Sequence, residues 1–202
     1  HAFFKALLFL GAGCVIHSFH EEQDINFMGG VWKKIPYTYT LMIIGTLALT
    51  GFPFLSGYYS KDAIIEFAYL KGNTIGYFAT FTGIITAVLT AFYSWRLIFK
   101  TFHGRFNNKE KNFSSINESP LTMLIPACIL AIGAVFTGYL FKEIFIGQEN
   151  SNFWNNSILI LKSVDLEHVP TWLLATTPLA VTIIIPIAYY IFVENQKILN
   201  NF

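Results

Sequence analysis

Long apolar stretches separated by short polar ones make up most of the sequence. The apolar stretches fall at residues 2–18, 36–71, 75–102, 120–141 and 170–193. A helix needs about 20 predominantly apolar residues to cross a bilayer, so the first stretch falls slightly short and the others are long enough. The pattern predicts an all-α fold, a polytopic transmembrane helix bundle with about five membrane crossings.

The stretch at residues 36–71 departs from a simple crossing. It is about 35 residues long, which is too long for one untilted helix and short for two helices joined by a turn. Gly51, Pro53 and Gly57 in its centre weaken or interrupt the helical hydrogen-bond ladder. Backbone groups that are freed in hydrocarbon need partners from protein or water. We therefore predict a single crossing helix that is broken at residues 51–58.

The residues after this break suggest where a second half-helix starts. Ser60 is of a residue type that caps helix N-termini. Asp62 would then lie in the first turn, where the helix dipole favours an anion. We expect the second half-helix to begin near Ser60.

The distribution of basic residues distinguishes one crossing from two. With one broken crossing, a large group of basic residues falls on one side of the membrane: Lys33, Lys34, Arg96, Lys100, Arg105, Lys109, Lys111 and Lys197. The other side holds only Lys71, Lys142 and Lys162. The positive-inside rule then places the larger group in the cytoplasm or its equivalent. Two crossings would spoil this asymmetry, so we favour one.

Composition supports a membrane protein. Of the 202 residues, 54% are hydrophobic and 12% are charged, whereas soluble domains carry about 25% charged residues. The net charge of +1 gives no reason to expect nucleic acid as a partner. Cys14 and Cys128 lie in apolar stretches, and neither a disulfide nor a metal site is expected. Because His1 opens directly into an apolar stretch, we expect residues 1–202 to be a single membrane fragment of a larger domain.

Two lysines lie deep in the apolar stretches. At about 1.5 Å per residue, Lys5 should lie about 20 Å from the cytoplasmic end of its helix, near the membrane centre. Lys61 follows the break, so it should also lie near the midplane. A lysine in hydrocarbon costs at least about 2.5–3.5 kcal/mol, and desolvation makes its proton easy to remove. Both lysines are candidate proton carriers; the alternative is that they snorkel or pair structurally.

Three further ionisable residues are candidates for a proton relay. Asp62 and Glu66 are four residues apart and share a helix face. Asp62 can act as a counter-charge or a relay acid, and Glu66, a weaker candidate, can lie near the aqueous exit. His1 stands one turn before Lys5 on the same face, and an imidazole titrates near neutral pH. A single histidine on an apolar face is more often structural.

Hydroxyl groups can line a polar path between these sites, although helix packing is their more frequent role. The candidates are Thr46, Thr50, Ser56, Ser60, Thr80, Thr82, Thr86 and Thr90. The loop at residues 20–24 lacks the ligand spacing of a metal site. The sequence has no glycine-rich phosphate loop, no cysteine cluster and no nucleophile–base pair, so a redox or hydrolytic site within it is not expected.

Several of these segments together resemble one family. They are HAFFKALLFLGAG at residues 1–13, HEEQD at 20–24, MGG at 28–30, and residues 51–62, which end in Ser-Lys-Asp. They resemble the largest antiporter-like membrane subunits of respiratory complex I, known as subunit L or chain 5 of NADH–quinone oxidoreductase. The resemblance is specific to about residue 105 and looser beyond. It implies two inverted five-helix repeats, each with a broken helix, of which this chain would be a C-terminal-half fragment.

The resemblance also implies roles for individual residues. Lys5 matches the family's central lysine and His1 its neighbouring relay histidine. Lys61 and Asp62 match the pair on the broken helix that is associated with proton exit. Cys14 stands where the family is expected to have a small polar residue.

The implied function is proton translocation as a subunit of NADH:quinone oxidoreductase, in a bacterial plasma membrane or the mitochondrial inner membrane. The implied partners are the lipid bilayer and the other membrane subunits of complex I. No cofactor is expected in this chain, and NAD, FMN, iron–sulfur clusters and quinone would bind in other subunits.

Two alternatives remain at this point. The large subunit of a multisubunit sodium–proton antiporter shares the fold and the central lysine, but the Ser-Lys-Asp segment and the HEEQD loop favour complex I. A structural membrane scaffold would also contain buried lysines, held in static ion pairs. Sealed pairs in a structure would favour the scaffold.

Overall fold

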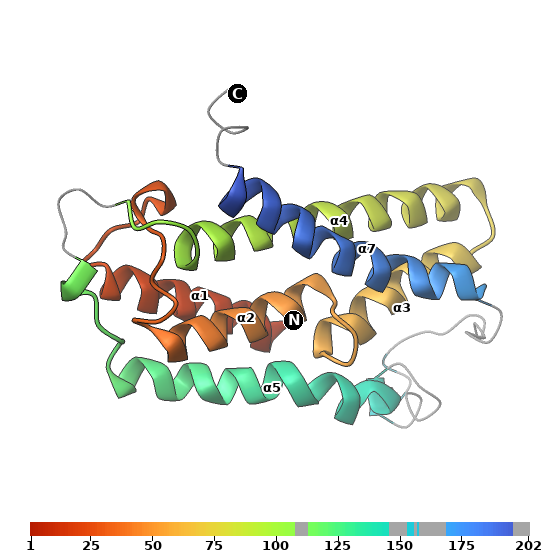
Figure 1. The fold of residues 1–202 in the computed structure, drawn as a ribbon. Coiled ribbons are helices and arrows are strands. Elements are labelled where there is room, and N and C mark those ends of the chain that lie inside the picture. Colours follow the sequence, from red (N-terminus) through yellow and green to blue (C-terminus); the bar gives the residue numbers. More distant parts are fainter. Residues whose placement is uncertain (108–112, 146–152, 156, 158–168, 196–202) are drawn as a thin grey trace.

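Apolar helices lie side by side along one direction in the computed structural model (Figure 1). The structure describes residues 1–107, 113–145, 153–155, 157 and 169–195. The helices are α1 (Ala2–Ser18), α2 (Pro36–Thr50), α3 (Ser56–Leu70), α4 (Thr74–Phe102), α5 (Leu121–Phe145) and α7 (Thr171–Tyr189), the last continued by a π-helical turn (Tyr190–Glu194). Short 3₁₀ turns fall at Ile25–Phe27 and Phe113–Ser115. No strand occurs in these described ranges.

Three helices have the length and hydropathy of a membrane crossing. They are Thr74–Phe102 with 29 residues, Leu121–Phe145 with 25, and Thr171–Glu194 with 24. Less than a third of each apolar window is buried within the bundle, at 28%, 28% and 22%. The other apolar side chains face outward, toward lipid or other protein. The fold is therefore an all-α transmembrane helix bundle, as predicted.

α2 and α3 form the two halves of a broken helix. In Figure 1 the two helices follow one another along the bundle, and α4 and α5 each pack against both. Residues 51–55, called the break from here on, separate them. The broken helix predicted from the sequence is confirmed, but the break covers residues 51–55 and not 51–58. α1 packs against α2 and α5, and its start lies near the middle of the bundle (Figure 1).

Backbone geometry explains why α2 stops where it does. Gly51 takes the left-handed conformation, with φ of 83°, and Phe52 N–H donates to the carbonyl of Leu47 at 3.0 Å. This is the usual arrangement at a helix C-terminus that ends in glycine. Phe54 within the break also has a positive φ of 71°, which is rare for a bulky residue.

The predicted start of the second half-helix was wrong. α3 begins at Ser56, and Ser60 does not cap it; the Ser60 hydroxyl donates to the carbonyls of Ser56 and Gly57 at 3.5 and 3.3 Å. Asp62 therefore lies in the second turn. The earlier start is possible because Gly57 has no Cβ, which would collide with the carbonyl oxygen of Ala48 at the end of α2.

The loops before α2 and after α4 meet at one end of the bundle. Gly30 N–H donates to the carbonyl of His103 at 3.0 Å, and Trp32 N–H to that of Phe102 at 3.3 Å. We call this the basic end, after Lys33, Lys34, Lys100 and Arg105. Four other basic residues in the charge argument lie outside the described residues: Lys109, Lys111, Lys162 and Lys197.

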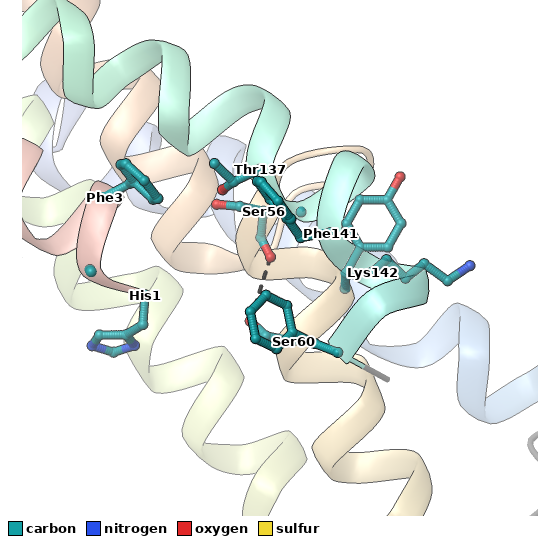
Figure 2. Close-up of a pocket in the computed structure, with 11 residues that line it drawn as sticks. His1, Phe3, Ser56, Ser60, Thr137, Phe141 and Lys142 are labelled. Atoms are coloured by element: carbon teal, nitrogen blue, oxygen red, sulfur yellow. Dashed lines mark hydrogen bonds between the residues drawn. The ribbon is translucent and has the colours of Figure 1, made fainter. Parts of the chain in front are cut away.

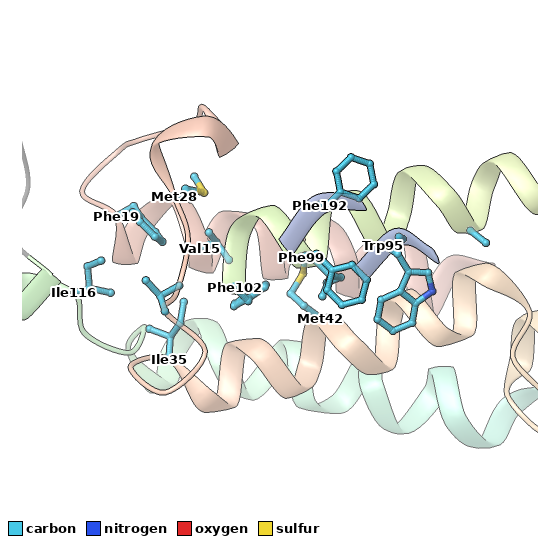
Figure 3. Close-up of a cluster of buried hydrophobic side chains, with 14 of the residues drawn as sticks. Val15, Phe19, Met28, Ile35, Met42, Trp95, Phe99, Phe102, Ile116 and Phe192 are labelled. Carbon is cyan, nitrogen blue, oxygen red and sulfur yellow. The ribbon is translucent and has the colours of Figure 1, made fainter. Parts of the chain in front are cut away.

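The basic end also holds the largest apolar cluster of the described residues (Figure 3). Its buried side chains come from α1, α2, α4, α7, the π turn and the loops before α2 and before α5. They include Val15, Phe19, Met28, Ile35, Met42, Trp95, Phe99, Phe102, Ile116 and Phe192. The start of α2 is thus packed on several sides. Its other end meets the break.

Candidate functional site

Lys61 on α3 lies against the end of α2. A Cβ placed on Gly51 would be 3.4 Å from Lys61 Cδ, so the lysine stem packs directly on the glycine that ends α2. The last carbonyls of a helix carry a partial negative charge, which favours a nearby ammonium group. The break therefore places the lysine next to the negative end of a half-helix.

The charged atoms at the break have no hydrogen-bond partners. Lys61 Nζ and both carboxylate oxygens of Asp62 are buried and unpaired within the described part of the chain. Adjacent helical residues point about 100° apart, so the two side chains diverge. The ion pair found among the described residues joins Lys142 to Glu143 at 3.6 Å on the surface. An isolated buried ion costs several kcal/mol, so unpaired groups of this kind are candidates for function.

A cavity of about 320 Å³ opens between α3 and α5 beside the break (Figure 2). His1, Ser56, Ser60, Thr137 and Lys142 are among the residues that line it. The buried Ser56 hydroxyl lacks a partner among the described atoms. Because one water needs only about 10–15 Å³ by a comparable measure, the cavity has room for several.

The structure separates Lys5 from this site. Lys5 N–H donates to the carbonyl of His1 at 3.1 Å, so the two residues are one helical turn apart, as their spacing predicts. Both are exposed on α1. Phe4 is the residue of α1 that packs toward Gly57. Among the described residues, no hydrogen bond or ion pair connects Lys5 to the charges on α3.

Glu66 lies one turn beyond Asp62 and is half-buried. The cation that acts on it electrostatically is Lys142 of α5. The Lys142 amine lies 5.8 Å from the centre of the Tyr59 ring, at the side of the cavity. Glu66 thus interacts with a cation from a neighbouring helix.

Comparison with known proteins identifies the family. A family model described as NADH:quinone oxidoreductase/Mrp antiporter, transmembrane, matches residues 1–90, which include the break and every predicted site residue. NADH-ubiquinone oxidoreductase chain 5 of Arabidopsis thaliana is 50% identical over 80% of this chain and 24% of the relative. The Phytophthora infestans protein of the same name is 47% identical over 85% of this chain and 26% of the relative. The Dictyostelium discoideum protein of that name is 43% identical over 99% of this chain and 31% of the relative.

This chain belongs to the chain 5 family of NADH–ubiquinone oxidoreductase. It spans about a quarter to a third of the length of these chain 5 relatives, at 24% to 31%. The resemblance noted from the sequence is confirmed, and so is the assignment to integral membrane proteins. The roles of Lys5, His1, Lys61, Asp62 and Glu66 stay predictions.

Hydroxyl groups of α4 are hydrogen-bonded within their own helix. Thr86 is exposed and Thr82 and Thr90 are half-buried, and each donates to the carbonyl four residues earlier, at 2.7, 2.9 and 2.6 Å respectively. Their hydroxyls are bonded within their own helix. The polar path predicted along this helix stays a prediction.

The loop at residues 20–24 serves local structure. Asp24 accepts a hydrogen bond from Asn26 N–H at 2.8 Å and caps the first 3₁₀ turn. His20 Nε2 lies 3.3 Å from the carbonyl oxygen of Ser115. Among the described residues, no three histidine, cysteine or acidic side chains gather as a metal site would require.

Two polar features escaped the sequence analysis. Glu118 bonds to the first turn of α2 from 80 positions away in the sequence. Trp95 Nε1 is buried with no hydrogen-bond partner among the described atoms. A single sequence carries no signal for either, because the first depends on a long-range contact and the second on helix packing.

Proposed function

We propose that this chain is part of the proton-translocating, antiporter-like subunit of NADH:quinone oxidoreductase, complex I. The observation that supports this most directly is the pair of buried, unpaired charged groups of Lys61 and Asp62 at the break. A scaffold would be expected to seal such charges in ion pairs. Groups without fixed partners can gain or lose a proton when the local field or hydration changes.

Proton transfer at the break would need an energy source. Moving one charge against about 100 mV costs about 2.3 kcal/mol. In this proposal, redox chemistry in other subunits changes the field and hydration around Lys61 and Asp62. Lys61 passes its proton through the cavity beside Ser56 and Ser60, and Glu66 takes part at the exit.

Lys5 and His1 would form the neighbouring segment of the relay. Figure 1 places the start of α1 near the middle of the bundle, where an exposed lysine would face hydrocarbon at a cost of at least about 2.5–3.5 kcal/mol. We infer that other protein covers this face of α1. The chain 5 relatives have enough additional chain to do so, because this chain spans only 24% to 31% of their length.

The partners in this proposal are the other membrane subunits of complex I and the lipid around the outward apolar faces, with no nucleic acid. The complex would lie in the mitochondrial inner membrane or a bacterial plasma membrane. NAD, FMN, iron–sulfur clusters and quinone would bind in other subunits, and this chain would contribute no redox site.

The large subunit of a multisubunit sodium–proton antiporter remains the second candidate. The matching family model includes Mrp antiporters in its description. The relatives compared above are all named chain 5 of NADH-ubiquinone oxidoreductase, which favours complex I. Sodium-dependent proton movement without NADH oxidation would support the antiporter.

Proton pumping in membrane vesicles tests the proposal. We expect Lys61→Ala in the assembled complex to lower the number of protons moved per NADH oxidised. Lys33→Ala is a matched control, because Lys33 is exposed at the basic end, with its amine 5.1 Å from the Trp32 ring centre. Wild-type stoichiometry in Lys61→Ala would reject the proposal.

A further inference from the structure

Glu118, just before α5, supplies the N-terminal cap of α2. Its Oε2 accepts a hydrogen bond from Tyr37 N–H at 2.8 Å, and Thr38 N–H lies 3.4 Å from both oxygens. The Thr38 hydroxyl also donates to Oε1. α2 has no cap of its own, since Ile35 occupies the N-cap position and Pro36 brings no N–H. The carboxylate therefore satisfies the free donors of the first turn.

The next residue ties the same point to α1. Ser119 Oγ donates to the carbonyl of Cys14 at 3.0 Å and lies 3.3 Å from Ser18 Oγ. Ser119 is buried. The segment at Glu118 and Ser119 thus fixes the relative positions of α1, α2 and α5.

The opposite end of α2 is the end that Lys61 contacts. With 15 residues, α2 is about 22 Å long. Its N-terminus carries a partial positive charge next to the Glu118 carboxylate, and its C-terminus a partial negative charge next to Lys61. Each side-chain charge is therefore stabilised by the helix end that it lies beside.

We propose that Glu118 is a positioning residue of the proton-transfer site. By holding the start of α2, it fixes the position of the break along the bundle. Its charge also contributes to the electrostatic potential at Lys61. This inference rests on the proposed function of Lys61 as a proton carrier, and Glu118 itself carries no proton in it.

Other titratable groups surround Glu118. The Cys14 thiol faces it from α1. Lys34, in the loop before α2, has its amine 5.4 Å from the Phe113 ring centre, and no described ion pair joins it to Glu118. His20 lies beside Ser115 in the same region. The first turn of α2 is therefore the main hydrogen-bonding partner of this carboxylate.

The pH profile of proton pumping by the intact complex tests the inference. Glu118→Gln retains the shape and one acceptor oxygen but removes the charge. A unit charge about 22 Å away, at an effective dielectric constant of about 20, shifts a proton equilibrium by about 0.5 pH unit. We expect the alkaline limb of the Glu118→Gln profile to move to lower pH by about that amount, because the protonated amine loses a favourable interaction.

Two variants complete the test. Glu118→Asp retains the charge and should keep the wild-type limb. Glu21→Gln removes an exposed charge at the basic end and should cause no shift. If the complex with Glu118→Gln fails to assemble, the pH profile of Glu118→Asp decides the question. A shifted alkaline limb in Glu118→Asp would contradict the inference.

Failure of the inference and failure of the proposed function give different results. A wild-type profile in Glu118→Gln, together with lost pumping in Lys61→Ala, overturns the role of Glu118 alone. Normal pumping in Lys61→Ala overturns the proposed function, whatever Glu118→Gln does.

Discussion

Polar groups are hydrogen-bonded at one end of α2 and lack partners at the other. At its start, the free N–H groups are bonded to Glu118, and the adjoining loops are hydrogen-bonded to the end of α4. At its far end, Lys61 and Asp62 are buried without partners among the described residues. The same half-helix thus has a satisfied end and an unsatisfied one. Since this fold satisfies the polar groups at one end of α2, the unpaired charges at the other end support the proposed proton transfer.

The largest expected effect is on Asp62. We predict that Asp62→Asn lowers proton pumping at least about 10-fold while the assembled complex becomes no less stable, because the change removes an unpaired buried charge. Asp24→Ala at the basic end should do the reverse. Pumping should persist while the loop loses about 0.5–2 kcal/mol of capping energy. Proton pumping in vesicles and thermal unfolding of the complex would be measured for both variants. If Asp62→Asn lost stability as well as pumping, the result would contradict the contrast between the two ends of α2.

A smaller effect is expected from the close approach of the two half-helices. Gly57→Ala should destabilise the subunit by about 1–3 kcal/mol, since the added methyl group would push α3 away from Ala48. Gly13→Ala is the matched control, because no atom lies within 4 Å of a Cβ built there. Thermal stability of the purified complex decides the question. Equal stability of the two variants would mean that the half-helices are not in tight contact.

The smallest effect concerns His103 at the basic end. Its Nε2 is hydrogen-bonded to Tyr39 OH at 3.0 Å, and the Trp32 ring stacks at 6.5 Å. Burial lowers the pKa of His103 from its ordinary value of 6.5. Its neutral form therefore contributes stability above about pH 6.5 that is lost as the pH falls toward the lowered pKa, by about 1 kcal/mol per pH unit.

Hydrogen exchange at the amides of Gly30 and Trp32 would report this loosening, since both donate to the end of α4. We expect faster exchange below pH 6.5, after correction for the intrinsic rate. His103→Phe should remove this pH dependence. A dependence that persists in that variant would assign it to another group.

The sequence predicted the fold more completely than the site. Gly51, Pro53 and Gly57 indicated a broken helix, and the distribution of basic residues favoured one crossing over two. The start of α3 was misplaced, because a serine cap is a local signal and the contact between Gly57 and Ala48 is not. Local patterns determine helices, whereas contacts between helices determine where they begin.

For the site, the sequence identified ionisable residues but not their surroundings. Helical spacing correctly placed His1 and Lys5 one turn apart, yet gave no indication that Lys5 would be exposed on α1. It also did not show that Lys61 packs on Gly51 or that Glu118 caps α2. Both depend on which faces of separate helices meet, which a single sequence does not encode locally.

A double-mutant cycle on Lys61 and Asp62 tests the central claim, that the two buried charges are not a sealed pair. The stability of the assembled complex would be measured for Lys61→Ala, Asp62→Ala and the double variant. We predict that the double variant is no more stable than the sum of the single changes implies, within about 0.5 kcal/mol. Removing one partner of a buried ion pair costs about 3–5 kcal/mol. A double variant that recovers most of such a loss would contradict the account.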